Sequence, residues 1–264
     1  PPPTLLSSAA SDVYKRQGND KPRLFRLAAD HAIINRMGFN NAGVEALVEN
    51  VKRSESSCVL GINIGKNKVT PLEKAVDDYL ACMQKVYCFA DYITINISSP
   101  NTPGLRELQH GDGLTSLLTR LKAEQAELSR QYNRYVPLAV KIAPDLEERE
   151  IQDIAERLLA AEIDAVIATN TTNSRPASLL EKKLAAETGG LSGAPVYALS
   201  NRVLEQLVAV LKGRIPVIAA GGISSPADAV QKIKSGASLV QIYTGFIYFG
   251  PSLIRSCSKH LAGF

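Results

Sequence analysis

The chain of 264 residues is 45% hydrophobic, with a mean hydropathy of −0.03, which is enough for one large α/β domain with a substantial core. Its formal net charge of +4 comes from 30 basic and 26 acidic residues without a block of like charge, so a nucleic-acid partner is not indicated. The four cysteines lack the spacing of a metal motif or a disulfide framework, which favours a reducing compartment and no metal. No apolar stretch approaches the roughly 20 residues of a membrane helix.

The first seventeen residues have neither a periodic pattern nor the layout of a signal peptide. We expect residues 1–17 to be an unrelated or disordered tail. The folded domain is then expected at 18–264.

Short apolar runs that end in polar residues or glycine alternate with helix-length amphipathic segments along the rest of the chain. This alternation is typical of βα units, and runs without polar interruption are typical of strands covered on both faces. The predicted strands are 58–64, 92–97, 137–142, 164–169, 215–220 and 238–243. The predicted helices are 71–89, 113–132, 146–162, 198–211, 226–235 and 251–261, with an additional helix at 41–53. Asp145 and Ser225 are candidate N-caps.

Six βα units are two fewer than a closed (β/α)₈ barrel requires. The last two units nevertheless carry the glycine-rich turns that such barrels place after their seventh and eighth strands. We therefore expect a (β/α)₈ TIM barrel whose first two strands are missing from this chain, so that the domain is incomplete at its N-terminus. An open doubly wound sheet is the alternative.

Three predicted strands have an asparagine within one residue of their end: Asn63, Asn96 and Asn170. In parallel barrels the strand ends meet at one mouth, so three amides are expected to converge there. A single asparagine is as often a turn former that bonds its own backbone, but three at the same point of the repeat make that interpretation weaker.

Lys141 stands in an otherwise apolar strand, where a buried ammonium needs a compensating anion unless it reaches water. The turns 189–193, 220–223 and 243–245 are rich in glycine and small residues. Backbone amides in such turns can approach a phosphate, which indicates a phosphorylated ligand such as a flavin mononucleotide. Each turn alone is weak evidence for a phosphate site, because glycine pairs also mark ordinary turns.

The segment 98–104 is rich in turn formers, which is compatible with a simple rigid loop. The three histidines show no metal spacing and no triad, so a hydroxyl group becomes conceivable as the base.

Eight motifs in this order make the chain resemble class 2, quinone-linked dihydroorotate dehydrogenase of the bacterial type, from about residue 18 onward. They are NRMGFN (35–40), GINIG (61–65), NISSPNTPG (96–104), AVKIAP (139–144), IATNTT (167–172), TGGLSG (188–193), AGGI (220–223) and LVQIYTG (239–245). The resemblance implies a barrel that holds FMN and oxidises dihydroorotate to orotate in pyrimidine (UMP) biosynthesis, with a quinone as the final electron acceptor.

The resemblance also assigns roles to residues of this chain. Ser99 would be the base that takes the C5 proton while hydride passes to the flavin, and a serine rather than a cysteine at this position indicates class 2. The matching flavin contacts are Asn63, Asn96, Lys141, Thr169, Gly193, Gly222, Tyr243 and Thr244. The matching substrate contacts are Asn35, Arg36, Met37, Gly38, Phe39, Asn96, Asn101, Asn170 and Thr171.

Some features of the family have no match here. Its first strand ends in a motif with a lysine that touches flavin and substrate, and its second strand supplies a threonine to the flavin. We therefore expect this chain to bind FMN weakly or not at all. The family's N-terminal helices, which attach it to the cytoplasmic side of the inner membrane and form the quinone tunnel, also have no match, although Arg26 matches a position lining that tunnel. The chain as it stands is expected to be soluble in the cytoplasm.

Three other functions stay open. Another FMN barrel oxidoreductase would share the terminal glycine turns. A non-redox barrel enzyme, such as a sugar-phosphate isomerase, would need a carboxylate or histidine base at a strand end. The chain would otherwise be an inactive fragment of the dehydrogenase.

Overall fold

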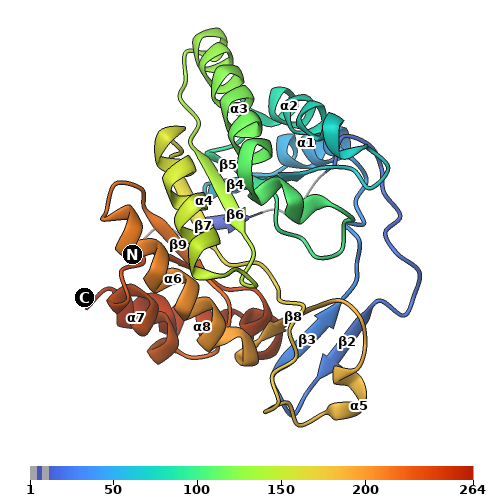
Figure 1. The fold of residues 1–264 in the computed structure, drawn as a ribbon, viewed down its shortest axis with the longest axis vertical. Helices are drawn as coiled ribbons and strands as arrows, with labels where there is room; N and C mark the ends of the chain where they lie inside the picture. Colours follow the sequence, from blue (N-terminus) through green and yellow to red (C-terminus); the bar gives the residue numbers. More distant parts are fainter. Residues whose placement is uncertain (1–4, 8–11, 264) are drawn as a thin grey trace.

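The computed structural model describes the backbone of residues 5–7 and all of residues 12–263 (Figure 1). All six predicted strands are present, and they lie in a parallel sheet of seven strands in the order β1-β4-β5-β6-β7-β9-β10. The strands are β1 Leu5–Ser7, β4 Val59–Gly65, β5 Tyr92–Asn96, β6 Leu138–Ile142, β7 Ala165–Ala168, β9 Val217–Ala220 and β10 Leu239–Gln241.

The strand order of this sheet follows the chain without a reversal. A doubly wound sheet reverses its order at a switch point, whereas a barrel adds each strand beside the previous one. The predicted TIM-barrel class is therefore confirmed, and the open doubly wound alternative is wrong. Among the described residues the curled sheet forms an open part of a barrel. Strands β1 and β10 are the two edges of this sheet and do not pair with each other.

The segment expected as a separate tail contributes to this sheet. Strand β1 pairs in parallel with β4, with Leu5 opposite Val59. Further along, Arg16 forms a bridge with Asn41 and a buried ion pair with Asp12 at 3.0 Å. The described part of the segment thus packs on the domain instead of extending away from it. A three-residue strand is too short to give a periodic pattern, which is why the sequence did not reveal it.

The long helices between the strands of the main sheet cover its outer, convex face, whereas the short α5 lies apart from that sheet (Figure 1). The helices are α1 Val44–Lys52, η1 Leu72–Lys74, α2 Ala75–Val86, η2 Leu105–Gln109, α3 Gly111–Tyr132, α4 Glu148–Ala160, α5 Lys182–Ala185, η3 Ala194–Val196, α6 Tyr197–Leu211, α7 Pro226–Lys234 and α8 Thr244–Leu261. Ser225 caps α7 as predicted, because its side chain accepts the Asp228 N–H. Asp145 does not cap α4; the cap is Glu147, in a capping box with Glu150.

Helix α8 begins seven residues before its predicted start at position 251. It continues through a kink at Gly250, whose φ of 64° is left-handed and which precedes Pro251. The sequence predicts the start at the proline because proline is over-represented at the first position of a helix.

The two faces of each main strand bury different residues, as alternating side chains require. Ile93, Ile95 and Val140 point to the helices and join the large core between helices and sheet. Ala139 and Ile167 belong to a small cluster on the concave face.

A second, antiparallel sheet was not expected from the sequence. It contains β2 Leu24–Leu27, β3 Ala32–Asn35 and β8 Gly190–Gly193 in the order β2-β3-β8, and it forms a lobe with α5 beside the main sheet (Figure 1). The sequence predicts a small-residue turn at 189–193, but most of this segment is β8. Glycine is needed there because a Cβ on Gly193 would lie 2.2 Å from the His31 carbonyl oxygen.

Replacing Leu118 with alanine tests the core under α3. Leu118 is fully buried in the large core, so Leu118→Ala should lower the free energy of unfolding by about 2–5 kcal/mol. Urea denaturation measures the change. Leu180 is 68% exposed, and Leu180→Ala should change stability by less than about 0.5 kcal/mol. Equal effects of the two substitutions would contradict this description of the core.

Candidate active site

The register of the main sheet brings polar side chains together on its concave face. Asn96 lies opposite Gly65 of β4 and Lys141 of β6, and Asn63 lies opposite Thr94. Because Thr94 and Asn96 are two residues apart, they point to the same side of the sheet. Of the three predicted strand-end asparagines only Asn96 ends its strand. Asn63 lies inside β4, and Asn170 follows the end of β7 by two residues.

An amide cluster joins the ends of β5 and β7. Asn170 Nδ2 donates to Asn96 Oδ1 at 3.2 Å and to Ser98 Oγ at 3.0 Å. The Ser98 backbone N–H also donates to Asn96 Oδ1 at 3.2 Å. Asn96 is 4% exposed and Ser98 is fully buried. The predicted convergence of strand-end amides is therefore present for Asn96 and Asn170.

Ser99 lies in the loop after β5, between this cluster and the antiparallel sheet. Its side-chain oxygen accepts the Asn101 N–H at 3.2 Å, and the residue is 4% exposed. Asn101 Nδ2 donates to Asn35 Oδ1 at 3.2 Å and to the Asn35 carbonyl oxygen at 3.1 Å. The loop that carries Ser99 is thus held against the end of β3.

Arg106 connects this loop to two others, and no sequence motif points to it. Its Nε donates to the Ser98 carbonyl oxygen at 3.1 Å, and one NH2 group donates to the Thr171 carbonyl oxygen at 2.9 Å. The other NH2 group of Arg106 forms an ion pair with Asp145 at 2.8 Å. Three loops, after β5, β6 and β7, therefore meet at one guanidinium, whose planar array of donors suits such a junction.

Asp145 accepts several hydrogen bonds besides this ion pair. Thr172 Oγ1 and the Asn173 N–H both donate to its carboxylate. Burial raises the pKa of Asp145, but hydrogen bonds from Thr172, Asn173 and Arg106 outweigh it and hold that pKa below its ordinary value. Asp145 is therefore an ionised structural anchor.

Lys141 is partly buried on the concave face, and its Nζ donates to Gln241 Oε1 of β10 at 3.3 Å. Among the described residues no carboxylate lies within 4.0 Å of it. Burial lowers the pKa of Lys141 to about 8. The nearby Thr94 Oγ1 is also buried and has no hydrogen-bond partner within the described part of the chain. A cation and a hydroxyl on this face are thus available to a ligand.

Glycine turns follow the last strands at the same edge of the sheet. After β9, Gly221 and Gly222 have positive φ of 112° and 79°. After β10, Thr244 Oγ1 donates to Ser192 Oγ of β8 at 2.9 Å. A Cβ on Gly245 would lie 2.2 Å from the Ile223 carbonyl oxygen, so the two turns are in contact.

The remaining predicted site residues are more spread out. Arg36 points to the segment before β8, where it pairs with Glu187 at 2.8 Å and donates to Thr188. Tyr243 is 76% exposed. The other positions lie in the segment after β3, at the end of β7 and in β8: Met37, Gly38, Phe39, Thr169, Thr171 and Gly193. Phe39 packs close to Gly65 of β4. A Cβ added to Gly65 would lie 3.2 Å from the Phe39 ring.

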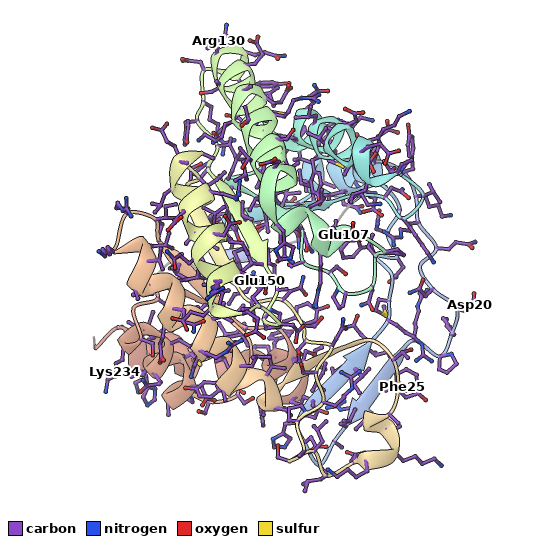
Figure 2. All side chains as sticks on the ribbon, viewed as in Figure 1. Asp20, Phe25, Glu107, Arg130, Glu150 and Lys234 are labelled. Carbon is purple, nitrogen blue, oxygen red and sulfur yellow. The ribbon has the colours of Figure 1, made fainter. Side chains whose placement is uncertain are left out.

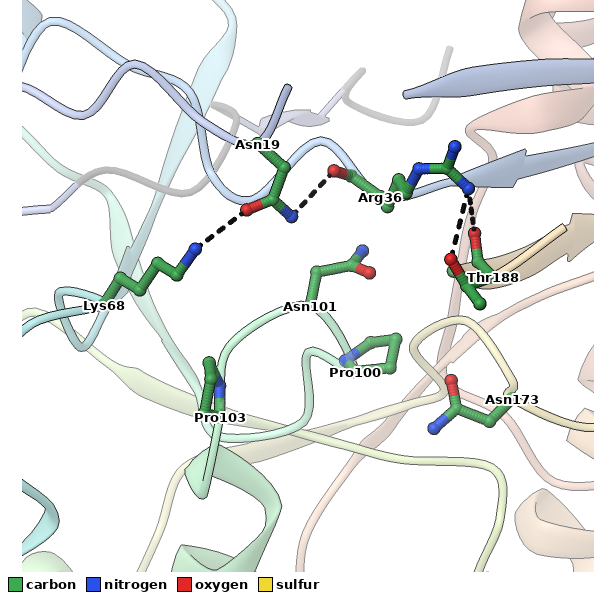
Figure 3. Close-up of a pocket in the computed structure, with 9 residues that line it drawn as sticks. Asn19, Arg36, Lys68, Pro100, Asn101, Pro103, Asn173 and Thr188 are labelled. Carbon is green, nitrogen blue, oxygen red and sulfur yellow. Dashed lines mark hydrogen bonds between the residues drawn. The ribbon is translucent and has the colours of Figure 1, made fainter. Parts of the chain in front are cut away.

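A cavity of about 430 Å³ opens on the outer side of the Ser99 loop. Asn101 and Pro100 line one side of it, and Arg36 and Lys68 lie on the other (Figure 3). Lys68 reaches across to Asn19 Oδ1 at 3.1 Å (Figure 3). Asn101 therefore stands between an open polar cavity and the buried Ser99.

The sequential parallel sheet, with its polar groups gathered where the strands end, defines an enzyme of the (β/α) barrel class. The family described as dihydroorotate dehydrogenase matches residues 6–264. The chain belongs to this family.

Named relatives are similar over most of the chain. A "Dihydroorotate dehydrogenase (quinone)" of Idiomarina loihiensis is 63% identical over 244 residues, which cover 92% of this chain and 72% of that protein. One from Vibrio parahaemolyticus is 58% identical and also covers 92% and 72%. A crystal structure of DHODH from Eimeria tenella in complex with ferulenol has a TM-score of 0.91 at 41% identity, covering 98% of this chain and 74% of that chain.

Removing the guanidinium of Arg106 should loosen the Ser99 loop. In Arg106→Gln, amides of residues 98–104 should exchange hydrogen about 10- to 100-fold faster, because charge-assisted hydrogen bonds to three loops are lost. Mass spectrometry of exchanged peptides measures this. Arg130→Gln, at an exposed arginine of α3, is the matched control. Unchanged protection in Arg106→Gln would show that the junction does not hold the loop.

Lys141 should make stability depend on pH. Its folded pKa of about 8 is below the ordinary 10.5, so the burial penalty is fully present below pH 8 and is relieved as the pH rises toward 10.5. Lys141→Met should therefore be more stable than the parent by up to about 3 kcal/mol at pH 7, with a smaller difference at pH 9.5. Urea denaturation at both pH values measures it. Lys74→Met, at an exposed lysine, reports the effect of removing a solvated charge. If the stability difference between Lys141→Met and the parent grew with pH, a lowered pKa of Lys141 in the folded protein would be refuted.

Proposed function

We propose that the chain oxidises dihydroorotate to orotate in pyrimidine biosynthesis, with FMN as the bound cofactor, a quinone as final electron acceptor and Ser99 as the base. The names of relatives at 55–63% identity support the reaction and the acceptor. The observation that carries the assignment is the placement of Ser99. It is 4% exposed and lies between the Asn96–Asn170 cluster and Asn101.

The donor set on the concave face fits a flavin mononucleotide. FMN would supply hydride acceptance and the transfer of electrons to the quinone. Lys141 would place a positive charge beside the ring, and Thr94 would offer its unpaired hydroxyl to a polar ring atom. Asn63 and Asn96 would supply amides from β4 and β5. The turns at Gly222 and Thr244 would hold the phosphate, because their backbone can approach an anion closely.

The amides around Ser99 would bind the substrate. Dihydroorotate carries ring amides and a carboxylate, so it needs donors and acceptors together, and an asparagine side chain offers both. Asn35 and Asn101 face one another from the antiparallel sheet and the loop, while Asn96 and Asn170 meet on the other side of Ser99. Each pair already has fixed side-chain orientations, so little ordering is needed on binding.

Ser99 would remove the proton at C5. A hydroxyl is a weak base, and it needs groups that favour its deprotonated form. The Asn101 N–H, 3.2 Å from Ser99 Oγ, is such a donor, because a hydrogen bond to the oxygen stabilises negative charge there. Burial of the loop keeps bulk water away from the proton transfer.

The quinone acceptor places the second half-reaction at a membrane, since quinones of this kind are apolar. No described helix combines the length and the hydrophobicity required to cross a bilayer. Because the acceptor is apolar, we propose peripheral attachment at the cytoplasmic side of the inner membrane for the full-length family member.

A non-redox barrel enzyme is a weaker second candidate. It would need a free carboxylate or histidine at the rim. Asp145, a carboxylate near the cluster, is ion-paired with Arg106 and has a lowered pKa. Another FMN-dependent barrel enzyme would share Lys141 and the glycine turns. Turnover assays with different substrates distinguish such an enzyme from one that oxidises dihydroorotate. Flavin binding without turnover would indicate an inactive fragment.

The base assignment predicts the effect of Ser99→Ala. Turnover of dihydroorotate with a quinone analogue should fall about 100- to 10,000-fold, because general base catalysis is lost. Flavin affinity should stay within twofold, since Ser99 serves the substrate.

Ser99→Cys is the informative companion, because a thiol is also a proton acceptor. It should retain part of the activity with a changed pH profile. Full activity of Ser99→Ala would overturn the assignment, and turnover of another dihydropyrimidine in preference to dihydroorotate would favour the alternative oxidoreductase.

A further inference from the structure

A buried ammonium lies behind the glycine turn that follows β9. Lys232 of α7 is fully buried, and its Nζ donates to Ser200 Oγ at 2.6 Å. The same Nζ lies 5.2 Å from the centre of the Tyr197 ring. No ion pair within 4.0 Å joins it to a carboxylate in the described parts of the chain. A buried lysine without such a partner is costly and therefore calls for a reason.

Ser200 connects Lys232 to the turn. Because the ammonium occupies a lone pair of Ser200 Oγ, the serine hydroxyl hydrogen is left to donate to a carbonyl. The Gly221 carbonyl oxygen lies 3.0 Å away, as does that of Tyr197. Holding the Gly221 carbonyl toward Ser200 turns the Gly222 N–H to the opposite side, because C=O and N–H point in opposite directions across a trans peptide. That N–H donates to no acceptor among the described residues.

Close packing fixes the turn on the start of α6. A Cβ on Gly222 would lie 2.4 Å from Tyr197 Cα, and a Cβ on Gly221 would lie 3.0 Å from Ser200 Cβ. The glycines therefore rest directly on the helix that carries the hydroxyl. Any shift of Ser200 would be transmitted to the turn.

The nearby acidic residues do not neutralise Lys232 by direct contact. Asp228 accepts the Ser224 N–H at 3.0 Å, so its carboxylate serves the loop before α7. Burial lowers the pKa of Lys232 to about 8, with Asp228 and Glu205 acting in the opposite sense. The group thus stays largely protonated at pH 7. A role in packing alone would be served as well by an apolar side chain of similar volume.

We propose that Lys232 is a positioning residue for a phosphate group: through Ser200 it orients the Gly221–Gly222 turn, and its charge attracts the dianion that the turn receives. The phosphate of FMN is the expected ligand, and this identification rests on the proposed function. In a buried environment the attraction is only weakly screened by water and salt.

The test compares two flavins that differ only in the phosphate. FMN and riboflavin are titrated to saturation against the 264-residue chain, and flavin fluorescence reports binding. Lys232→Met should weaken FMN about 10- to 100-fold, because a charge-assisted interaction with the phosphate is lost. Riboflavin affinity should stay within twofold.

Lys234 provides the matched control. It lies on the same helix at the outer surface of the molecule (Figure 2), so Lys234→Met removes the same charge from the same element. Its effect on both flavins should be less than twofold. Ser200→Ala keeps the ammonium and removes the link, and it should weaken FMN by an intermediate amount, about 3- to 10-fold.

Equal affinity of Lys232→Met and the parent for FMN would overturn the proposal, as would an equal loss for FMN and riboflavin. Circular dichroism identifies a variant that does not fold. If Lys232→Met is such a variant, Ser200→Ala decides the question, and unchanged FMN binding in it overturns the proposal.

A second measurement separates this proposal from the proposed function. Inorganic phosphate should raise the melting temperature of the parent chain and of Lys234→Met, but not that of Lys232→Met. If the parent binds no flavin yet shows this phosphate effect, the flavin assignment fails and Lys232 keeps its role. If the parent responds to neither phosphate nor FMN, the proposal for Lys232 is wrong.

Discussion

Parallel pairing is the constraint on which the site depends. All strands of the main sheet run in the same direction, so their carboxyl ends and the loops that follow them meet at one edge. Register then decides which side chains face inward, and it places Asn96 beside Gly65 and Lys141. A slip of one residue in β5 would turn Asn96 outward and bury Ile95 or Ile97 on the wrong face. The large apolar core behind the sheet therefore also sets the position of the polar groups in front of it.

The polar groups of the site are held mainly by one another. Asn170 is bound to Asn96, Asn101 to Asn35, and Arg106 to the backbone of two loops. Such networks keep side chains oriented before a ligand arrives, which lowers the entropic cost of binding. The buried cations follow a different pattern. Lys141 and Lys232 each bond to one neutral oxygen atom, and both have lowered pKa values. A ligand with negative charge would relieve that cost.

The sequence predicted the main sheet well, because strands covered on both faces form continuous apolar runs. It failed for β2, β3 and β8, because all three strands are short and the pairing of β3 with β8 joins segments that are distant in the chain. The segment 189–193 shows the reason: its glycines allow backbone contact with β3, and that need is invisible without the partner. Among site residues, the asparagines were signalled by their place after apolar runs. Arg106 and Lys232 were missed because one lies in a short 3₁₀ helix and the other in a helix with many charged residues.

The antiparallel lobe has a consequence for how the molecule is made. Asn35 contacts Gly190, which follows it by 155 positions, and the Ser192 hydroxyl donates to the Ile33 carbonyl oxygen across 159 positions. Closing so large a loop is entropically costly and slow. During synthesis on the ribosome, β3 can pair with β2 early, but its second partner, β8, exists only after most of the polypeptide has emerged. The Asn35 side of the cavity is completed late, after β4 to β7 have been made.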